Sequence, residues 1–170
     1  DLVSAPEHGS SQPSAYLAKP RVLVVDADRL IRVLVEDAIK EFAEVELCES
    51  GEAALQALRR APAALVISDL TMPGLSGIEL LDEVSRGYPN TDFVLLTGNA
   101  TVDSAVGALR IGAADYLTKP VRQDELALVV ERILSRRRLF EENEKLRDTL
   151  RTVDSCRNLM RCVEPGEIYA

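Results

Sequence analysis

Four polar residues each stand at the end of a short apolar run: Asp26 after VLVV, Asp69 after ALVIS, Thr97 at the end of FVLLT and Lys119 after YLT. Carboxylates bind hard cations and can attack phosphorus, while a hydroxyl and an ammonium can bind phosphoryl oxygens. Such acids also occur as turn or helix-capping residues. Chemistry is therefore expected only if the fold brings the four residues together.

The apolar runs are nearly continuous and rich in β-branched residues, as strands buried on both faces of a sheet are. The predicted strands are residues 22–25, 45–48, 64–68, 93–97 and 116–118, with amphipathic helices at about 29–42, 51–60, 77–86 and 101–111. Five strand–helix repeats predict an α/β fold with a doubly wound, five-stranded parallel sheet. Sites in such sheets lie at the carboxyl ends of the strands, where the four polar residues stand.

The composition is that of a soluble globular protein, with 46% hydrophobic and 28% charged residues and a net charge of −8. This charge argues against broad attraction to nucleic acid or anionic membranes. The cysteines, Cys48, Cys156 and Cys162, lack metal-ligand spacing and predict free thiols in a reducing, cytoplasmic compartment. The single histidine, His8, lies in a polar leader, so histidine-based nucleophilic catalysis is not expected. The sequence shows neither a signal peptide nor an apolar run near the roughly 20 residues that span a bilayer.

From Gln123 to Met160 the sequence has no strong helix breaker. Apolar residues, with one asparagine among them, recur there at steps of four and three: Leu139, Asn143, Leu146, Leu150 and Val153. This heptad pattern predicts a coiled coil, and a polar residue at an a position such as Asn143 favours a two-stranded pair in fixed register. We predict a parallel homodimer; the alternative is a helix packed against an absent domain.

The domain prediction has four parts: a flexible leader (1–19), the α/β domain (20–135), a dimerising signalling helix (136–162), and the start of a further segment (163–170). More protein is expected downstream, because the last residues break the helix without closing another element.

The motifs VLVVDAD, LVISDLTMPGLSGIELL, VLLTG and GAADYLTKP resemble the receiver domain of two-component response regulators, over roughly residues 20–135. The resemblance implies the flavodoxin-like (βα)5 form of the sheet. It implies that Asp69 accepts a phosphoryl group from a sensor histidine kinase or a phosphotransfer protein, and that Thr97 and Lys119 bind the phosphoryl oxygens. Such a domain is a signalling switch rather than a metabolic enzyme, and it catalyses only its own phosphorylation and dephosphorylation.

The resemblance also implies a Mg²⁺ site formed by Asp26, Asp69 and the backbone carbonyl of Thr71. Receivers usually carry two adjacent acids after the first strand, whereas here Ala27 takes the second place and Asp28 comes one residue late. Three interpretations are open: a weakened but working site, with Asp28 as a possible ligand; a degenerate receiver; or an alanine introduced to trap one state. The first is preferred because Asp69 and its partners are intact.

The family further implies a cis peptide bond between Lys119 and Pro120, and a switch in which Tyr116 turns inward when a phosphoryl oxygen captures Thr97. The coupled surface would be the fourth helix, the fifth strand and the fifth helix.

Two alternatives to a phosphorylated receiver are open. One is a pseudo-receiver that dimerises without phosphorylation. The other is a haloacid dehalogenase-like phosphohydrolase, whose Asp-x-Asp motif VVDADRL resembles and in which Asp26 would be the nucleophile. The hydrolase leaves the Met-Pro-Gly loop after Asp69 unexplained. The sequence does not identify the output module.

Overall fold

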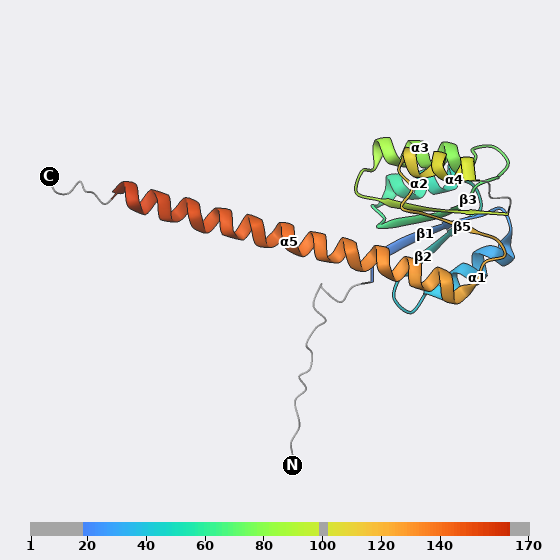
Figure 1. The fold of residues 1–170 in the computed structure, drawn as a ribbon, viewed down its shortest axis with the longest axis horizontal. Helices are drawn as coiled ribbons and strands as arrows, with labels where there is room; N and C mark the ends of the chain where they lie inside the picture. The colour runs from blue at the N-terminus through green and yellow to red at the C-terminus, as the bar shows by residue number, and fades with distance from the viewer. Residues whose placement is uncertain (1–18, 99–101, 164–170) are drawn as a thin grey trace, which may run out of the picture. The chain divides into compact units, whose positions relative to one another are not determined.

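The computed structural model describes residues 19–98 and 102–163, with side chains for 19–98 and 106–150. Strands and helices alternate along this part of the chain (Figure 1). The elements are β1 (Arg21–Val25), α1 (Arg29–Ile39), β2 (Glu44–Cys48), α2 (Gly51–Arg60), β3 (Leu65–Asp69), α3 (Gly77–Gly87), β4 (Asp92–Thr97), α4 (Val102–Ile111), β5 (Asp115–Thr118) and α5 (Gln123–Val163).

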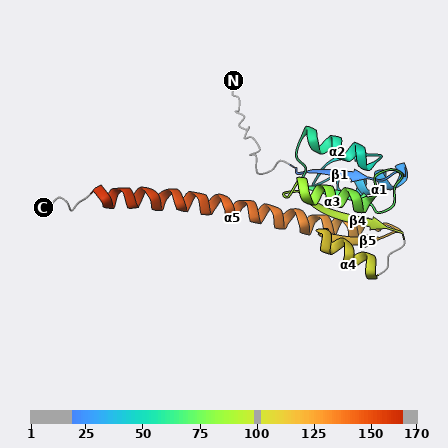
Figure 2. The same cartoon turned by 90° about the horizontal axis from the view of Figure 1, so that it is seen from above.

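The five strands form one parallel sheet in the order β2-β1-β3-β4-β5. Helices α2, α3 and α4 cover one face of this sheet, and α1 with the first turns of α5 covers the other (Figures 1 and 2). The predicted doubly wound parallel sheet is confirmed. Because β1, β3 and β4 lie in the middle of the sheet, their carboxyl ends are neighbours along one edge.

The three central strands are buried almost throughout, which explains their continuous apolar sequences. On the α2–α3–α4 face, Leu23, Val66, Phe93 and Leu95 belong to one hydrophobic cluster. Burial of each such side chain contributes about 1.5–3 kcal/mol. The strand ends are therefore carried by the most stable part of the fold.

Side-chain caps fix the starts of the helices that follow β1, β2 and β3. Asp28 caps α1, Ser50 caps α2, and Ser76 caps α3 in a capping box with Glu79. Each cap satisfies backbone donors that a helix leaves unpaired in its first turn. The connections at the carboxyl edge of the sheet are therefore short and ordered.

The predicted first helix extends three residues too far. Helix α1 ends at Ile39, and the amides of Phe42 and Ala43 both donate to the carbonyl of Ile39 in the turn that follows. Apolar periodicity continues through Phe42 because this turn returns Ala43 to the buried core. Periodicity alone does not distinguish such a turn from another helical turn.

Helix α5 is continuous from Gln123 to Val163, as the lack of helix breakers predicted. The chain divides within it into two compact units, one ending at Glu131 and the other beginning at Arg132. Within residues 19–98 and 102–163, no helix combines the length and apolarity that crossing a membrane requires.

Helix α3 begins in close contact with the end of β3. A Cβ atom at Gly77 would lie 2.1 Å from the carbonyl oxygen of Asp69 and 2.7 Å from the Cα of Leu70. The amide of Gly77 also donates to the carbonyl of Leu70 at 2.8 Å. A side chain at position 77 would therefore displace the backbone that carries Asp69.

We expect Gly77→Ala to lower the free energy of unfolding by about 1–3 kcal/mol, the usual cost of overpacking. Urea unfolding measures this change. Gly107→Ala is the matched control, because a Cβ atom at Gly107 in α4 meets no atom within 4 Å. Alanine at that position should stabilise the protein by about 0.4–1 kcal/mol. Equal effects of the two substitutions would contradict the steric role of Gly77.

Candidate functional site

The ammonium of Lys119 lies between two carboxylates at the carboxyl edge of the sheet. Its Nζ is 3.0 Å from Asp26 Oδ2 and 3.4 Å from Asp69 Oδ2. The side chains of Asp26, Asp69 and Lys119 are 2%, 14% and 22% exposed. The structure thus brings together three of the four residues predicted from the ends of the apolar runs, in a partly buried site that solvent can reach.

The strand order explains why these distant residues meet. Asp26 directly follows β1, and Asp69 ends the neighbouring strand β3. Lys119 follows β5, and its backbone amide donates to the carbonyl of Thr97 at 2.7 Å. The Lys119–Pro120 peptide bond is cis, as predicted.

Burial and charge oppose each other at this site. Burial raises the pKa of Asp69, and the negative charge of Asp26 raises it further, while Lys119 lowers it by less. For Lys119, burial would lower the pKa, but hydrogen bonds and charge attraction from Asp26 and Asp69 together outweigh it and raise the pKa. Lys119 therefore stays positive at neutral pH, and one ammonium faces two acidic groups.

Asp26 is held by backbone contacts on several sides. Its Oδ1 accepts a hydrogen bond from the amide of Asp28 at 2.8 Å, and its carbonyl accepts one from Arg32 Nη1 at 2.6 Å. The amide of Asp26 donates to the carbonyl of Cys48 at 3.2 Å. These bonds fix the carboxylate at the edge of the sheet.

Asp28 has a different role in the structure from that of Asp26. Its Oδ1 accepts a hydrogen bond from the amide of Leu30 at 2.9 Å and so caps α1. Ala27, between the two acids, is exposed. The structure pairs Asp26 and Asp69 through one lysine and uses Asp28 as a cap; a metal-binding role for Asp28 stays a prediction.

The remaining groups suit a hard divalent cation. Asp26 and Asp69 approach the same ammonium, so both carboxylates border one small volume. Mg²⁺ in proteins is commonly held by one or two carboxylates, with water and other oxygens completing its shell. The amide of Thr71 donates to Asp69 Oδ1 at 3.4 Å, which places the Thr71 backbone beside the carboxylate. Among the described residues no cluster of three or more His, Cys, Asp or Glu could hold a metal, in keeping with alanine at position 27.

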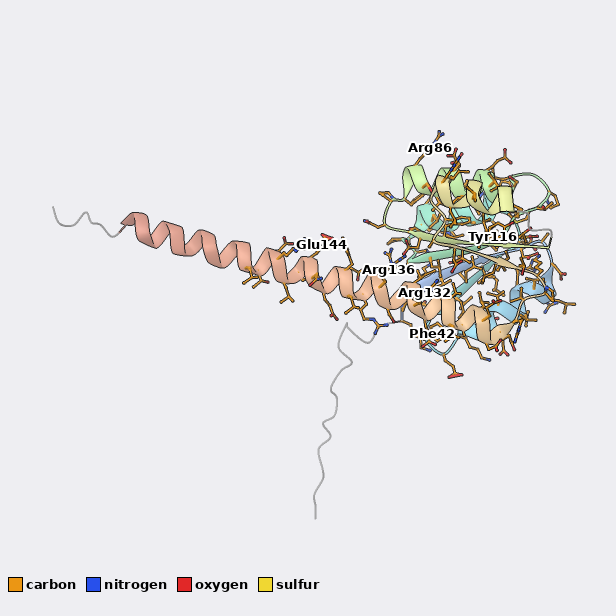
Figure 3. All side chains as sticks on the ribbon, in the orientation of Figure 1. Phe42, Arg86, Tyr116, Arg132, Arg136 and Glu144 are labelled. Atoms are coloured by element: carbon orange, nitrogen blue, oxygen red, sulfur yellow. The ribbon has the colours of Figure 1, made fainter. Side chains whose placement is uncertain are left out.

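Thr97 and Tyr116 project toward the same face of the sheet. Thr97 is the buried last residue of β4, and Leu95, two residues earlier, is paired with Tyr116 of β5. Side chains two residues apart on a strand share a face, as do paired residues on neighbouring strands. Tyr116 is partly buried against the cluster on that face (Figure 3). Thr97 and Tyr116 thus share a face of the sheet, and the switch between them stays a prediction.

The predicted dimer seam lies in the second unit. Leu139, Asn143, Leu146 and Leu150 are exposed there, and the side chain of Val153 lies outside the described residues. Phe140 is also exposed, next to Leu139.

Two contacts of the site were missed from the sequence. Arg32 bonds the carbonyl of Asp26, and Glu52 Oε2 accepts a hydrogen bond from the amide of Leu75, in the loop after Asp69. Both residues occur at positions that suit an ordinary solvated helix face. The only sequence signal was the acidic residue in the first turn of α2, which helix electrostatics alone would explain.

Comparison with known proteins agrees with this geometry. Residues 22–131 match the response regulator receiver domain family. Response regulator protein FleR of Pseudomonas aeruginosa is 42% identical over 116 residues, covering 66% of this chain and 24% of FleR. DNA-binding transcriptional regulator NtrC of Escherichia coli is 34% identical over 128 residues, covering 75% of this chain and 27% of NtrC.

The crystal structure of NtrX from Brucella abortus superposes with a TM-score of 0.70 at 34% identity, covering 76% of this chain and 30% of NtrX. The chain spans roughly a quarter of the length of the curated relatives FleR and NtrC.

Proposed function

The chain belongs to the response regulator receiver family, and we propose that Asp69 is its phosphoacceptor, phosphorylated by a sensor histidine kinase or a phosphotransfer protein. The observation that carries the proposal is the Lys119 ammonium, 3.4 Å from Asp69 Oδ2 and 3.0 Å from Asp26 Oδ2. Phosphoryl transfer depends mainly on positioning and on neutralising charge at the phosphoryl oxygens. A carboxylate beside a fixed ammonium meets both requirements.

In the proposed step, a carboxylate oxygen of Asp69 attacks the phosphorus of a phosphohistidine. The P–N bond breaks, its electrons return to the imidazole, and an acyl phosphate forms on Asp69. Lys119 would exchange its contact with the Asp69 carboxylate for one with a phosphoryl oxygen, and the Thr97 hydroxyl would donate to another. Attack by water on the phosphorus later returns Asp69 and releases inorganic phosphate.

Asp26, Asp69 and the carbonyl of Thr71 would hold Mg²⁺. A bound divalent cation neutralises charge on the phosphoryl oxygens. Because Ala27 provides no carboxylate, we propose that this site binds Mg²⁺ more weakly than a site with two adjacent acids, and that water supplies the missing ligand.

The response would pass from Thr97 to Tyr116 and then to the surface of α4, β5 and α5. Movement of the Thr97 hydroxyl toward a phosphoryl oxygen would leave space that the Tyr116 ring can occupy. A ring that changes position at an exposed surface alters what that surface can bind.

The downstream part would provide the output. FleR and NtrC are several times longer than the part that matches this chain, and NtrC is described as a DNA-binding transcriptional regulator. We assign no DNA-binding role to the acidic chain described above; such an activity would reside in a downstream module. The exposed heptad residues of α5 would join two copies of the chain in a parallel dimer.

A phosphorylation-independent dimer module is the second candidate. Ala27 favours it, because a receiver that never bound metal would not need the second acid. The family match argues against the hydrolase alternative, in which Asp26 would be the nucleophile.

We expect the chain to gain the mass of one phosphoryl group on incubation with acetyl phosphate and Mg²⁺, and to lose this gain in Asp69→Ala. Intact mass spectrometry measures the adduct. Asp82→Ala is the matched control, because it removes a carboxylate on α3 that pairs with Arg86 and has no assigned role in the site. An unmodified wild-type chain would favour the dimer module, and an adduct that persists in Asp69→Ala would refute the assignment of the phosphoacceptor.

Ala27→Asp should tighten Mg²⁺ binding by about tenfold or more, because it restores a carboxylate at the edge of the site. Calorimetric titration measures the dissociation constant. Since Ala27 is exposed, the substitution should leave the fold intact. Ala27→Asn has a similar size without the charge and should bind Mg²⁺ less tightly than Ala27→Asp. Unchanged affinity in Ala27→Asp would show that the missing acid does not limit binding.

Asn143→Leu should broaden the oligomeric state from one dimer to a mixture, because a buried asparagine at an a position restricts register and strand number. Light scattering after gel filtration measures the distribution. Glu144→Gln, at the next position on α5 (Figure 3), lies off the seam and should leave the dimer unchanged. A single unchanged species in Asn143→Leu would refute the register role.

A further inference from the structure

The start of α2 fits directly against the loop that follows the proposed phosphoacceptor. A Cβ atom at Gly51 would lie 3.0 Å from Leu75 Cβ and 3.1 Å from the Leu75 carbonyl oxygen. A Cβ atom at Gly74 would lie 2.9 Å from Glu52 Oε2, and Gly74 has a φ of +77°. The two backbones therefore approach each other at glycines, with the Glu52 carboxylate at the contact.

Glu52 makes a specific hydrogen bond across this contact. Its Oε2 accepts from the amide of Leu75 at 3.1 Å. Side chains on a helix lean toward its N-terminus, so a residue in the first turn of α2 points toward the neighbouring loop. Ser50, which caps α2, fixes the orientation of that turn.

The loop, residues 70–76, is held by hydrogen bonds at both ends. At its start, the amide of Leu70 donates to Leu96 and its carbonyl accepts from Gly77, each at 2.8 Å. Met72 is buried, whereas Thr71 and Gly74 are exposed. Two side chains outside the loop and α3 accept hydrogen bonds from it: Asp69 at the end of β3 accepts from the Thr71 amide, and Glu52 of α2 accepts from the Leu75 amide.

We propose that Glu52 is a positioning residue for the phosphoryl-transfer site. By holding the Leu75 amide, it restricts the loop that carries the Thr71 carbonyl, one of the groups proposed to bind Mg²⁺. The inference rests on the proposed function. The hydrogen bond between Glu52 and the Leu75 amide matters more in this chain than in one with two adjacent acids, because Ala27 leaves fewer protein ligands to fix the cation. A ligand held in place before binding loses less conformational freedom when the cation binds.

If Glu52 only stabilised the start of α2, its substitutions would have different effects. An acidic residue in the first turn stabilises a helix through its charge, so glutamine should fail there as alanine does. A hydrogen bond to the Leu75 amide needs only an acceptor oxygen, which glutamine retains. Glu52→Gln therefore separates positioning by a hydrogen bond from helix stabilisation by charge.

The test compares the full 170-residue chain as wild type, Glu52→Ala and Glu52→Gln. Calorimetry gives the Mg²⁺ dissociation constant, and amide hydrogen exchange without Mg²⁺ gives the protection of Leu75. Loss of one ordinary hydrogen bond corresponds to about a two- to tenfold change in an equilibrium. We expect Glu52→Ala to weaken Mg²⁺ binding and to speed exchange at Leu75 by that factor, and Glu52→Gln to restore both values to near wild type.

Several results would overturn the inference. They are unchanged Mg²⁺ binding in Glu52→Ala, failure of Glu52→Gln to restore binding, and a wild-type chain that does not bind Mg²⁺. Urea unfolding identifies any general loss of stability, and weaker binding accompanied by a matching loss of global stability would also count against positioning.

Failure of the proposed function is recognised separately. If acetyl phosphate leaves Asp69 unmodified, the proposed function fails, while Mg²⁺ affinity and Leu75 exchange still decide the role of Glu52. If Asp69 is modified, Glu52→Ala should need more Mg²⁺ for half-maximal phosphorylation and reach the wild-type rate at saturation. A lower rate at saturating Mg²⁺ with unchanged half-saturation would contradict a role in holding the metal ligand.

Discussion

The ion pairs of one lysine determine what the carboxyl edge of this sheet can do. Asp26 and Asp69 end neighbouring strands, so parallel pairing itself brings two carboxylates together in a partly buried place. Their mutual repulsion raises the free energy of the folded state unless a cation lies between them. Lys119 supplies that charge from β5, two strands from Asp69, because its long side chain reaches across the end of β4. The strand order brings the two acids together, the acids require a nearby cation, and only a side chain as long as lysine can supply it from β5.

The rest of the fold consists of a stable, buried central sheet and of loops and helix starts whose contacts can change. The central strands β1, β3 and β4 are buried almost throughout, and Asp26, Asp69 and Thr97 stand at their carboxyl ends. The contacts that orient the functional groups come instead from loop backbones and helix starts: Asp28 and Arg32 on Asp26, and Thr71 on Asp69. Individually such hydrogen bonds contribute about 0.5–1.5 kcal/mol, far less than the core. A domain built this way can change its loop contacts without unfolding, which a phosphorylation switch requires.

The sequence predicted what depends on long-range regularity and missed what depends on single contacts. Apolar runs identified all five strands, and the rule that sites lie at the carboxyl ends of parallel strands predicted the meeting of Asp26, Asp69 and Lys119. The end of α1 was wrong because Phe42 continues the apolar period into a turn. Asp28 was considered as a metal ligand, although its position before a helix also suited a cap. Glu52 and Arg32 bond backbone atoms of distant loops, and no pattern in sequence spacing reveals such a partner.

Alanine at position 27 changes the charge balance on which the proposed chemistry depends. Without a third acid, one ammonium opposes two carboxylates. The repulsion among the carboxylates is therefore smaller, and so is their attraction for a cation before phosphorylation. An incoming phosphoryl group then brings negative charge and oxygen ligands that a third carboxylate would otherwise have supplied in part. On the proposed chemistry, metal and phosphoryl group therefore favour each other's presence at the site, and by linkage this coupling acts equally in both directions. Such a receiver would hold its cation mainly while phosphorylated, which makes the occupied metal site a consequence of the signal as well as a requirement for it.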